Sequence, residues 1–430
     1  MSSFPAYLLA GHRYAVVGLG KAGLPAARAL VAMGAEVTVW DDKPAAREAA
    51  EGLVVAEPVL NGLTALVLSP GIPHALPKPH PIAEAARAAR VPIICDAELL
   101  YVAVRAAGSK ARFAGITGTN GKSTTTALLA HILTTAGVPN EAGANLGTAA
   151  LSLQLLSDDG VYVLEMSSYM LERIATLRFH VACMLNLSPD HLDRHGDMAG
   201  YAHAKRQIFA RQTNTDTAVI GIDDAYSLDM ANSLLRAIRI SEHDAPIAKG
   251  RTLPGLHNAQ NVSAATAMAR ALGVSDEAIE EGILTYPGLP HRQELVANIA
   301  GVDWINDSKA TNADSTAKAL SCYDNIVWIA GGSAKEGGIE TLAEYFPRIA
   351  HAFLIGRDAT VLAETLAHHQ VLHSIVGTLE TAVRQAALFA LGADPSPDVV
   401  LLSPACASWD QFTGFDQRGD QFRALAKGLA

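Results

Sequence analysis

Short apolar runs alternate with alanine-rich segments of helical pattern along the first hundred residues of the chain. The runs at residues 14–17 and 37–40 have the composition of buried strands, and helical segments separate such runs at intervals of about 20–30 residues. This alternation is typical of a parallel sheet with helices on both faces. The pattern therefore predicts a Rossmann-like, doubly wound α/β domain at residues 1–102.

The same alternation starts again twice further along the chain. Apolar runs at residues 161–164, 182–185 and 218–221 follow a glycine-rich segment near residue 115, and runs at 326–330, 352–355 and 399–402 come later. We therefore predict an α/β protein of three domains. The second is a central P-loop ATPase-type domain at residues 103–288, and the third is Rossmann-like and covers residues 289–430.

The 430-residue chain is half apolar and carries a formal net charge of −10 at pH 7. It has no Lys/Arg-rich run, which argues against a nucleic acid or an anionic membrane surface as partner. The sequence has no stretch of about 18 apolar residues and no signal-peptide pattern at its start, so we expect a cytoplasmic protein without membrane insertion. The four cysteines form no C-x-x-C pair, so neither zinc nor a disulfide framework is predicted.

The segment G-I-T-G-T-N-G-K-S-T at residues 115–124, here called the phosphate loop, has the composition of a strand-to-helix turn that binds a nucleoside triphosphate. Its glycines allow backbone N–H groups to surround an anion, Lys122 can reach the β- and γ-phosphates, and the Ser123 hydroxyl can bind Mg²⁺. The loop departs from the common pattern, because Ile116 stands five positions before Gly121, where glycine is usual. A bare strand-to-helix connection is the alternative.

A second glycine-rich segment, the glycine turn at residues 18–23, follows the first predicted strand and has the pattern G-x-G-x-x-G. Asp41 ends the next strand about 20 residues later, so the two features together match a dinucleotide-binding fingerprint. That fingerprint alone indicates NAD. Asp42 and Lys43 follow at once, however, and a second phosphate site lies downstream, so a different ribose-diphosphate ligand fits equally well.

Two polar residues follow predicted strands of the central domain. Glu165 comes directly after one strand, and His191 follows the next strand along the chain. Carboxyl ends of parallel strands are where such sheets bind ligands, so both side chains are expected near the phosphate loop as Mg²⁺ ligands or positioning groups. A helix-capping role for Glu165 and a surface position for His191 are the structural alternatives.

Six motifs occur along the whole chain in the order seen in Mur ligases. They are the phosphate loop, E-M-S-S-Y at 165–169, D-H-L-D-R at 190–194, H-N-A-Q-N at 257–261, L-P-H-R at 289–292 and N-D-S-K-A-T-N at 306–312. On these motifs the chain is identified as a member of the Mur ligase family. The 306–312 motif and L-S-P-A-C-A-S-W-D-Q-F at 402–412 resemble the branch that adds D-glutamate to UDP-N-acetylmuramoyl-L-alanine.

The resemblance implies a cytoplasmic ligase of peptidoglycan precursor synthesis, and thus a role in cell wall biogenesis, cell shape and cell division. Such a ligase uses ATP and two Mg²⁺ ions to form an acyl phosphate, which D-glutamate then attacks. The partners implied are UDP-N-acetylmuramoyl-L-alanine and D-glutamate, and a monomer is expected. Two anions must meet in this reaction, and unit charges about 4 Å apart repel by about 1 kcal/mol in water and about 4 kcal/mol at an effective dielectric near 20. Mg²⁺, Lys122 and Arg292 would offset that repulsion.

The resemblance also assigns residues to the parts of the site. The catalytic residues that it implies are Lys122, Asn145, His191, Lys205 and Arg292. The ATP-binding residues are Gly118, Thr119, Asn120, Gly121, Lys122, Ser123, Thr124, Asn258, Asn261, His291, Arg292, Asp307 and Lys309. Those for the UDP-substrate are Leu19, Gly20, Lys21, Ala22, Asp42, Lys43, Ser69, Pro70 and Gly71. Those for D-glutamate are Thr311, Lys335, Ser408 and Phe415, and the Mg²⁺ ligands are Ser123, Glu165, His191 and Lys205, the last as a carbamate.

Some of these residues have a plain structural alternative. Lys205, judged from its residue type and helical context, is a solvated surface lysine, and only the family motif favours the carbamate, whose oxygens suit Mg²⁺. Asn306 and Asp307 can build an Asx turn, and Lys335 can be a connector in a glycine-rich turn. Residues 42 and 43 are Asp-Lys where relatives often carry Thr-Arg. The choice of D- over L-glutamate rests on the resemblance alone.

Three rival functions stay open. Another ligase of the superfamily, such as a folylpolyglutamate synthase or an enzyme that adds a different amino acid, would differ in the first domain and in the acceptor pocket. The sequence lacks an Asp-Asn-Pro-Arg motif, which argues against an enzyme that adds meso-diaminopimelate. An NAD-dependent oxidoreductase would bind a nicotinamide nucleotide at the glycine turn and leave Lys122 without a role. A nucleotide-switched binding protein would bind ATP without substrate-dependent turnover.

Overall fold

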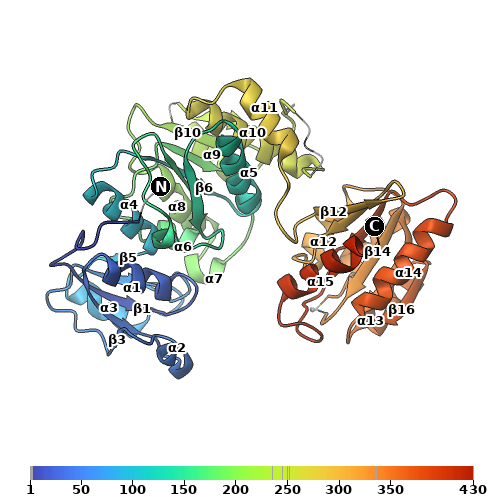
Figure 1. Ribbon diagram of the computed structural model, residues 1–430, viewed down its shortest axis with the longest axis horizontal. Helices are drawn as coiled ribbons and strands as arrows, with labels where there is room; N and C mark the ends of the chain where they lie inside the picture. The colour runs from blue at the N-terminus through green and yellow to red at the C-terminus, as the bar shows by residue number, and fades with distance from the viewer. Residues whose placement is uncertain are drawn as a thin grey trace. The chain divides into compact units, whose positions relative to one another are not determined.

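A computed structural model describes residues 3–234, 236–244, 246–248, 250, 252–334 and 337–429 of the chain. The chain divides into two compact units, of which the first comprises Met1–Lys249 and Leu256–Thr285 and the second comprises Gly250–Gly255 and Tyr286–Ala430 (Figure 1). Within the described residues, no helix is both long and apolar enough to cross a membrane. Cys95, Cys183 and Cys406 are buried free thiols, and the Cys322 thiol is half-buried.

The first unit contains two parallel sheets. The strands of the first sheet lie in the order β3 (Val54–Val55), β2 (Glu36–Trp40), β1 (Arg13–Val17), β4 (Ala65–Leu68) and β5 (Ile93–Ile94). Its helices are α1 (Gly23–Ala32), α2 (Pro44–Glu48), α3 (Pro81–Ala88) and α4 (Asp96–Ala106). The strand order reverses between β1 and β4, so the carboxyl ends of these two strands form the switch point at which doubly wound sheets bind ligands.

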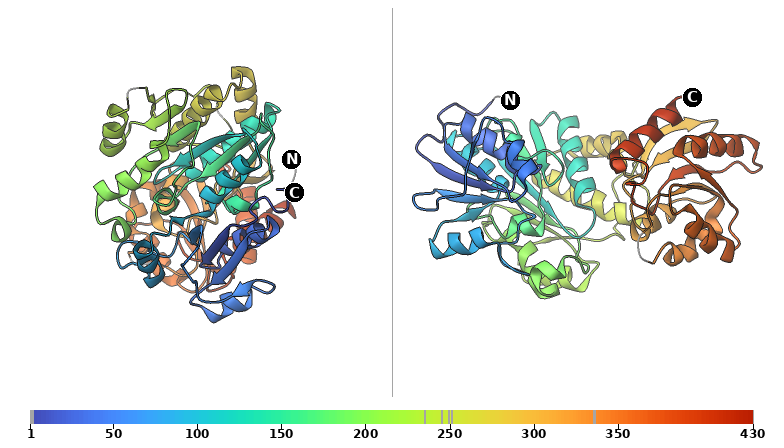
Figure 2. Two further views of the ribbon diagram at one scale, coloured as in Figure 1. Left: turned by 90° about the vertical axis from the view of Figure 1, so that its left-hand side faces the viewer. Right: turned by 90° about the horizontal axis from the view of Figure 1, so that it is seen from below.

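The strands of the second sheet lie in the order β11 (Ile238–Ile240), β10 (Thr217–Gly221), β9 (Val181–Met184), β6 (Arg112–Thr117), β8 (Val161–Glu165) and β7 (Asn140–Ala144). Its helices are α5 (Lys122–Thr135), η1 (Ala150–Ser152), α6 (Ser168–Leu171), α7 (Leu192–His195), α8 (Met198–Arg206), η2 (Gln207–Phe209), α9 (Ala225–Asn232), α10 (Leu256–Ala271) and α11 (Asp276–Thr285). Strand β6 lies between β8 and β9, and all neighbouring strands are parallel. Figure 2 shows this sheet in two further views.

One apolar core extends through both sheets of the first unit. It includes Val16 and Val67 of the first sheet, Leu30 of α1, Leu100 of α4 and Leu164 of the second sheet, all of them buried. Burial of apolar side chains is the main favourable contribution to folding, so a shared core joins the two sheets into one compact body. A smaller apolar cluster covers the other face of the first sheet, where α3 packs.

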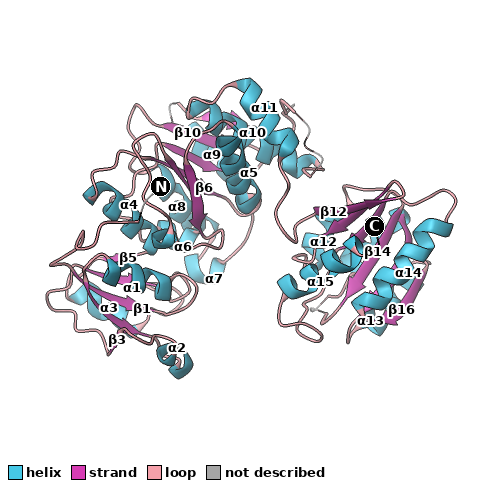
Figure 3. Ribbon diagram, viewed as in Figure 1, coloured by secondary structure: helices cyan, strands magenta, loops and turns pink. Residues whose placement is uncertain are grey.

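The second unit is built around a third sheet with the strand order β12 (Glu294–Ile299), β13 (Val302–Asn306), β17 (Val399–Leu402), β14 (Ile326–Gly331), β15 (Ile349–Ile355) and β16 (His373–Gly377). Apolar residues of α12 (Ala313–Leu320), η3 (Glu340–Arg348) and α13 (Ala359–His368) cover one face. Those of α14 (Leu379–Gly392) and α15 (Phe415–Lys427) cover the other (Figure 3).

The α/β fold class predicted from the sequence is confirmed, and each apolar run named above lies within or overlaps an observed strand. Strand β12 was not predicted, and it pairs antiparallel with β13 through a short turn at Ala300 and Gly301. The boundaries predicted at residues 102 and 288 stay predictions. The first two sheets share one apolar core and belong to one compact unit, so the compact units do not divide at residue 102.

Candidate functional site

The predicted site residues follow the carboxyl ends of strands within each unit. In the first sheet the glycine turn follows β1, and a turn at residues 69–74 follows β4. In the second sheet the phosphate loop begins at the end of β6, Glu165 ends β8, and His191 comes after β9. In the second unit, β17 lies between β13 and β14 and is parallel to both. The segments that follow these three strands, which include the 306–312 motif, are therefore neighbours at one edge of the sheet.

The phosphate loop leads from β6 directly into α5. Gly121 is the N-cap residue with φ of 83°, a left-handed conformation that glycine adopts without strain, and among the described residues no side chain caps the helix. The Lys122 ammonium donates hydrogen bonds to the carbonyl oxygens of Gly118, at 3.0 Å, and Thr119, at 2.8 Å. An uncapped helix N-terminus with a lysine folded over the loop fits the binding of phosphate oxygens.

Asn261 of α10 packs against this loop and is hydrogen-bonded to Asn258 of the same helix. The Asn258 side-chain oxygen accepts a hydrogen bond from the Asn261 amide at 2.9 Å, and Asn261 Oδ1 accepts one from the Thr125 hydroxyl at 3.2 Å. A Cβ atom at Gly121 would lie 2.2 Å from Asn261 Oδ1. The loop therefore has no room for a side chain at this position, and Asn261 lies directly against Gly121.

Asn186, which the sequence reasoning did not single out, holds two backbone groups of the phosphate loop. Its carbonyl oxygen accepts from the Thr119 N–H at 2.8 Å, and its Oδ1 accepts from the Asn120 N–H at 2.9 Å. Its side-chain amide donates to Gln260 Oε1 at 2.8 Å, and Gln260 donates to Asp223 at 2.6 Å. The position of Asn186, two residues after a buried strand, is the only sequence signal that could have identified it.

Lys205 lies in the interior, with only 2% of its surface exposed, which contradicts the solvated position that its helical context predicts. The ammonium donates to the Gly118 carbonyl at 2.8 Å and to the Thr117 hydroxyl at 3.2 Å. Burial, followed by the positive charge of Lys122, lowers the pKa of Lys205 well below its usual range. The prediction of a solvated lysine was wrong because the side of α8 that carries Lys205 packs against the phosphate loop. Such a tertiary contact is not specified by the helical pattern of the sequence.

Glu165 is also buried, and among the described residues only one of its two carboxylate oxygens has a hydrogen-bond partner. Oε1 accepts from the Asn145 amide at 2.5 Å, and the Asn145 N–H donates to the Glu165 carbonyl at 3.1 Å. Oε2 is buried and has no hydrogen-bond partner in the described part of the chain. A buried anionic oxygen without a partner is costly, and a divalent cation is a natural ligand for it.

His191 lies further toward solvent than Glu165 and Lys205. Its side chain is 48% exposed, its Nε2 is 3.4 Å from an Asp190 carboxylate oxygen, and its ring centroid is 5.0 Å from that of Tyr169. Its φ of 52° is unusual for a residue with a side chain. This left-handed conformation directs the chain from the segment after β9 into α7.

The three glycines of the glycine turn have different surroundings. A Cβ atom at Gly18 would lie 2.5 Å from Ser69 Cβ, and one at Gly23 would lie 1.9 Å from the Gly18 carbonyl oxygen. A Cβ at Gly20 would meet no described atom within 4 Å. The first and third glycines are thus required by packing within the protein, whereas the second leaves open backbone that fits close approach of a diphosphate.

The carboxylate of Asp41 binds the glycine turn itself. Its Oδ2 accepts from the Leu19 N–H at 2.7 Å, and its Oδ1 accepts from the Lys43 N–H at 2.9 Å. Asp42 is exposed and pairs with His80 at 3.0 Å, and Lys43 is exposed. In a dinucleotide site the equivalent carboxylate receives the ribose hydroxyls, so an Asp41 occupied by backbone N–H groups does not favour NAD.

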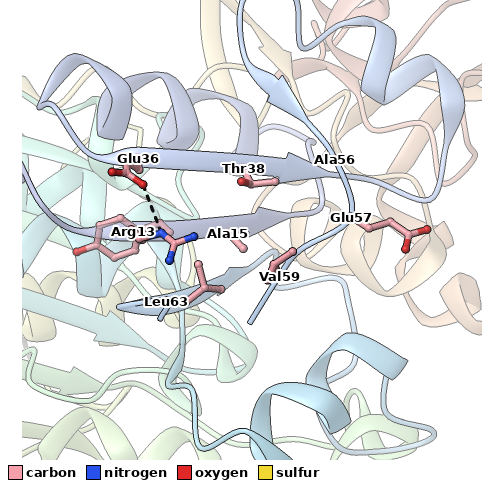
Figure 4. Close-up of a pocket in the computed structure, with 9 residues that line it drawn as sticks. Arg13, Ala15, Glu36, Thr38, Ala56, Glu57, Val59 and Leu63 are labelled. Carbon is pink, nitrogen blue, oxygen red and sulfur yellow. Dashed lines mark ion pairs between the residues drawn. The ribbon is translucent and has the colours of Figure 1, made fainter. Parts of the chain in front are cut away.

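A pocket on the same sheet lies away from these turns. It is lined by Arg13, Glu36, Thr38, Glu57, Val59 and Leu63 among others (Figure 4). Arg13 and Glu36 are the first residues of β1 and β2, and their side chains form an ion pair at 3.3 Å. The pocket thus includes the amino ends of the strands, whereas ligands of doubly wound sheets bind at the carboxyl ends.

In the second unit, His291 and Asp307 are buried and tightly held. Asn306 Nδ2 lies 3.1 Å from His291 Nδ1, and burial lowers the pKa of the His291 imidazole. Asp307 accepts from the Ser403 hydroxyl at 2.8 Å and from the Gln293 N–H at 3.2 Å, and burial raises its pKa to about 7. The Asx-turn alternative is present at Asn306, whose Oδ1 accepts from the N–H two residues later at 3.2 Å.

The structure brings together three of the residues assigned to the nucleotide and to D-glutamate. The Lys309 ammonium lies 5.1 Å from the centre of the Phe415 ring, a distance typical of a cation–π contact, and the Thr311 N–H donates to the Lys309 carbonyl at 2.9 Å. Ser408 is buried beside Ala407, which pairs with the segment after β14. Lys335 lies outside the described residues.

Arg418 is a buried residue that the sequence reasoning missed. Its guanidinium donates to Ser308 Oγ at 3.0 Å, to the Ser308 carbonyl at 2.8 Å and to the Cys406 carbonyl at 3.2 Å. It therefore joins the 306–312 motif to the segment after β17. The spacing of Arg418, Phe422 and Ala426, one helical turn apart, is the signal that places this arginine on the buried face of α15.

Known protein families and relatives match most of the chain. The family model of the Mur ligase middle domain matches residues 116–250, and that of the Mur ligase glutamate ligase domain matches residues 291–406. A protein of Paramagnetospirillum magneticum, named UDP-N-acetylmuramoylalanine--D-glutamate ligase, is 50% identical and aligns over 98% of both chains. The chain belongs to the Mur ligase family. The resemblance identified from the motifs is thereby confirmed.

Other members of the family agree in sequence or in fold. A Mur ligase of Caulobacter vibrioides with the same name is 47% identical over 96% of this chain and 95% of its own. The crystal structure of UDP-N-acetylmuramate-alanine ligase MurC from Thermotoga maritima matches with a TM-score of 0.59 at 17% identity, covering 97% of this chain and all of that one. MurF from Acinetobacter baumannii matches with a TM-score of 0.56 at 18% identity over 98% and 90% of the two chains. The two structures support the Mur ligase fold.

Proposed function

We propose that this chain is an ATP-dependent ligase that adds D-glutamate to UDP-N-acetylmuramoyl-L-alanine in peptidoglycan precursor synthesis. The observation that carries the proposal is the 50% identity, over 98% of both chains, with a relative named for this reaction. The phosphate loop and the buried Glu165 and Lys205 beside it support an ATP-dependent reaction. A cytoplasmic location and a monomeric state stay predictions.

The proposed reaction has two steps. An oxygen of the substrate carboxylate attacks the γ-phosphorus of ATP, the bond to the β-phosphate oxygen breaks, and ADP leaves. The amino group of D-glutamate then attacks the acyl carbon, loses a proton, and inorganic phosphate leaves as the amide forms. Because both groups that meet in the first step are anions, cations close to the γ-phosphate are the main requirement of the site.

We assign this requirement first to Lys122 and the N-terminus of α5. The lysine makes hydrogen bonds to two loop carbonyls, contacts that phosphate oxygens can replace. Asn258 and Asn261 of α10 are proposed to hold the nucleotide. By the family motifs, His291, Arg292, Asp307 and Lys309 are proposed as ATP-binding residues too. The remaining loop residues, Thr119, Asn120, Ser123 and Thr124, would contact the phosphates.

Glu165 fits Mg²⁺, because its Oε2 atom is buried and has no partner within the described residues. Ser123 and Glu165 would hold one ion, and His191 and a carbamate on Lys205 a second. Bound Mg²⁺ would supply positive charge to the phosphate oxygens. The burial of Lys205 between Gly118 and Thr117 supports the carbamate, since that position is beside the phosphate loop. In forming it, the amine attacks CO₂, a nitrogen–carbon bond forms, and one proton is released.

The substrate ends are assigned by the same family positions. The glycine turn with Leu19, Gly20, Lys21 and Ala22 would hold the diphosphate, and the uracil would lie by the turn at Ser69, Pro70 and Gly71. Asp42 and Lys43 are exposed beside them. Asn145 would contact the reacting carboxylate. Thr311, Lys335, Ser408 and Phe415 would receive the carboxylates of D-glutamate.

The decisive experiment is phosphate release with ATP, Mg²⁺ and UDP-N-acetylmuramoyl-L-alanine across a panel of amino acids. The panel contains D-glutamate, L-glutamate, L-alanine, L-lysine and meso-diaminopimelate. Turnover with D-glutamate alone is expected. Turnover with another amino acid would assign the chain to a sibling ligase, and binding of ATP without turnover would favour a nucleotide-switched protein.

The carbamate has a separate test. We expect ¹³C-bicarbonate to give a carbamate signal in the NMR spectrum of the Mg²⁺-loaded protein, and the signal to be missing from Lys205→Met. Lys110 is exposed, so Lys110→Met is the matched control and should keep the signal. A spectrum of the wild-type protein without this signal, under the same conditions, would contradict the carbamate.

A further inference from the structure

Arg173 is a buried arginine outside every motif discussed above. It lies two residues after α6, and only 2% of its surface is exposed. Its side chain extends from the segment after α6 to the turn that follows β4 of the first sheet, here called the 69–74 turn. A buried cation is expensive unless its hydrogen bonds are made, so the partners of Arg173 indicate what it does.

Those partners are backbone carbonyl oxygens of the first sheet. Nη1 donates to the Leu68 carbonyl at 2.7 Å and to the Ser69 carbonyl at 2.8 Å, and Nη2 donates to the Ile72 carbonyl at 2.5 Å. The three acceptors come from the end of β4 and from within the 69–74 turn. One planar group with a fixed set of donors therefore sets the path of this turn.

His74 completes the contact at the end of the turn. Its Nδ1 accepts from Arg173 Nη2 at 3.3 Å, and burial with the Arg173 charge lowers the pKa of His74 to about 4. The histidine is therefore neutral at physiological pH and able to accept this bond. A second arginine, Arg194, donates to the Gly71 carbonyl at 3.3 Å while its guanidinium stacks 4.3 Å from the Tyr169 ring.

The 69–74 turn in turn supports the glycine turn. A Cβ atom at Gly18 would lie 2.5 Å from Ser69 Cβ and 2.8 Å from Ile72 Cδ1, so the two turns are in direct contact. Both follow the strands β1 and β4 that form the switch point of the first sheet. Arg173 is also close in sequence to Glu165, so one short segment runs from the buried carboxylate to the turn.

We propose that Arg173 is a positioning residue for the uridine end of the substrate, which fixes the 69–74 turn against the second sheet. The inference rests on the proposed function, which puts the uracil beside Ser69, Pro70 and Gly71. Without the guanidinium, the carbonyls of Leu68, Ser69 and Ile72 lose the hydrogen bonds that Arg173 donates. The turn then keeps the bond from Arg194 to the Gly71 carbonyl as its remaining arginine contact. Arg173 itself does not act on the reacting atoms.

The test compares Arg173→Met with Arg173→Lys and a matched control. Arg211 is the control, because it also donates to three backbone carbonyls, those of Ala175 at 2.7 Å, Ile174 at 2.5 Å and Gln207 at 3.4 Å, and none of these belongs to the first sheet. We expect R173M to raise the KM for the UDP-substrate about tenfold and to leave the KM for ATP and for D-glutamate unchanged. R173K, which keeps the charge, should give a smaller rise, and R211M none.

Hydrogen exchange of a peptide that covers the turn gives a readout without turnover. Exchange should be faster in R173M and unchanged in R211M. Equal KM values for the UDP-substrate in R173M and wild type would overturn the inference, as would a parallel rise of all three KM values. If the wild-type protein forms no product with D-glutamate, the proposed function fails. In that case, titration with UDP and the exchange data test the positioning role of Arg173. Weaker UDP binding and faster exchange in R173M than in the wild type support the role, and equal affinity and equal exchange overturn it.

Discussion

Gly419, in α15, lies against the imidazole of His291, and the contact leaves no room for a methyl group. An ideal Cβ atom at this position would be 2.1 Å from His291 Nδ1 and 2.9 Å from the Cγ and Cε1 atoms. The ring would have to move by roughly 1 Å to restore a normal contact. His291 is held by Asn306 at 3.1 Å and by its own N–H, which donates to Glu294 at 3.0 Å, so it cannot move freely.

We therefore expect Gly419→Ala to cost about 1–3 kcal/mol of unfolding free energy, the range for an extra methyl group in a packed interior. Because His291 is proposed to bind ATP, its displacement should also raise the KM for ATP, by about tenfold for each 1.4 kcal/mol of binding lost. Thermal unfolding and phosphate release at varied ATP concentration measure the two effects. The KM for D-glutamate, measured with the same variant, shows whether the change in KM is limited to ATP.

Gly428 supplies the matched control at the end of the same helix. Its φ is −74°, and an added Cβ would meet its nearest neighbours only at 3.4 Å. Gly428→Ala should therefore leave both the unfolding midpoint and the KM for ATP close to those of the wild-type protein. The reasoning would be refuted if Gly419→Ala behaved like this control, since the proposed displacement of His291 would then not occur.

Three further predictions follow from the site. Gly121→Ala, at φ of 83° and with its Cβ 2.2 Å from Asn261, should weaken ATP binding by about tenfold and leave UDP binding unchanged, as isothermal titration can check; equal ATP affinity would contradict the packing argument. Glu165→Gln should lower phosphate release by about a hundredfold and raise the Mg²⁺ concentration required, so an unchanged Mg²⁺ titration would remove Glu165 from the metal site. Asp307 has a folded pKa of about 7, above its ordinary 3.8, so the folded state holds the proton to higher pH and stability is lost as pH rises through this window. The unfolding free energy of the wild type, relative to Asp307→Asn, should therefore fall between about pH 4 and 7 and level off above that range, and a difference that is constant with pH would disprove it.

Local patterns in the sequence were sufficient for the fold class and for the order of the motifs. Buried parallel strands are continuous apolar runs, so the runs at residues 161–164 and 399–402 predicted strands that the structure contains. The phosphate loop was predicted with its helix, because glycine, lysine and serine at that spacing are typical of a phosphate-binding turn between a strand and a helix. Strand β12 was missed because an antiparallel edge strand with mixed burial lacks a continuous apolar run.

Contacts between distant segments could not be obtained in this way. Nothing in the residue types around Arg173 distinguishes it from a surface arginine, and its role depends on carbonyl oxygens about a hundred residues earlier in the chain. Lys205 is a similar case, since its residue type and helical context predict a solvated lysine and only the family motif favours a position in the site. The environment of a charged side chain is decided by which elements pack over it, and that is a property of the tertiary structure.

The sequence by itself thus determined three β-sheets that alternate with helices, a phosphate loop between a strand and a helix, and membership of the Mur ligase family. These features depend on local periodicity and on motif order. Only the tertiary structure decided that Lys205 is buried beside the loop, that one oxygen of Glu165 lacks a partner within the described residues, and that Gly20 is open while Gly18 and Gly23 are packed. These properties depend on side chains and backbone groups that meet from separate strands. Their energies come from burial and satisfied hydrogen bonds, which exist only once the sheets have assembled.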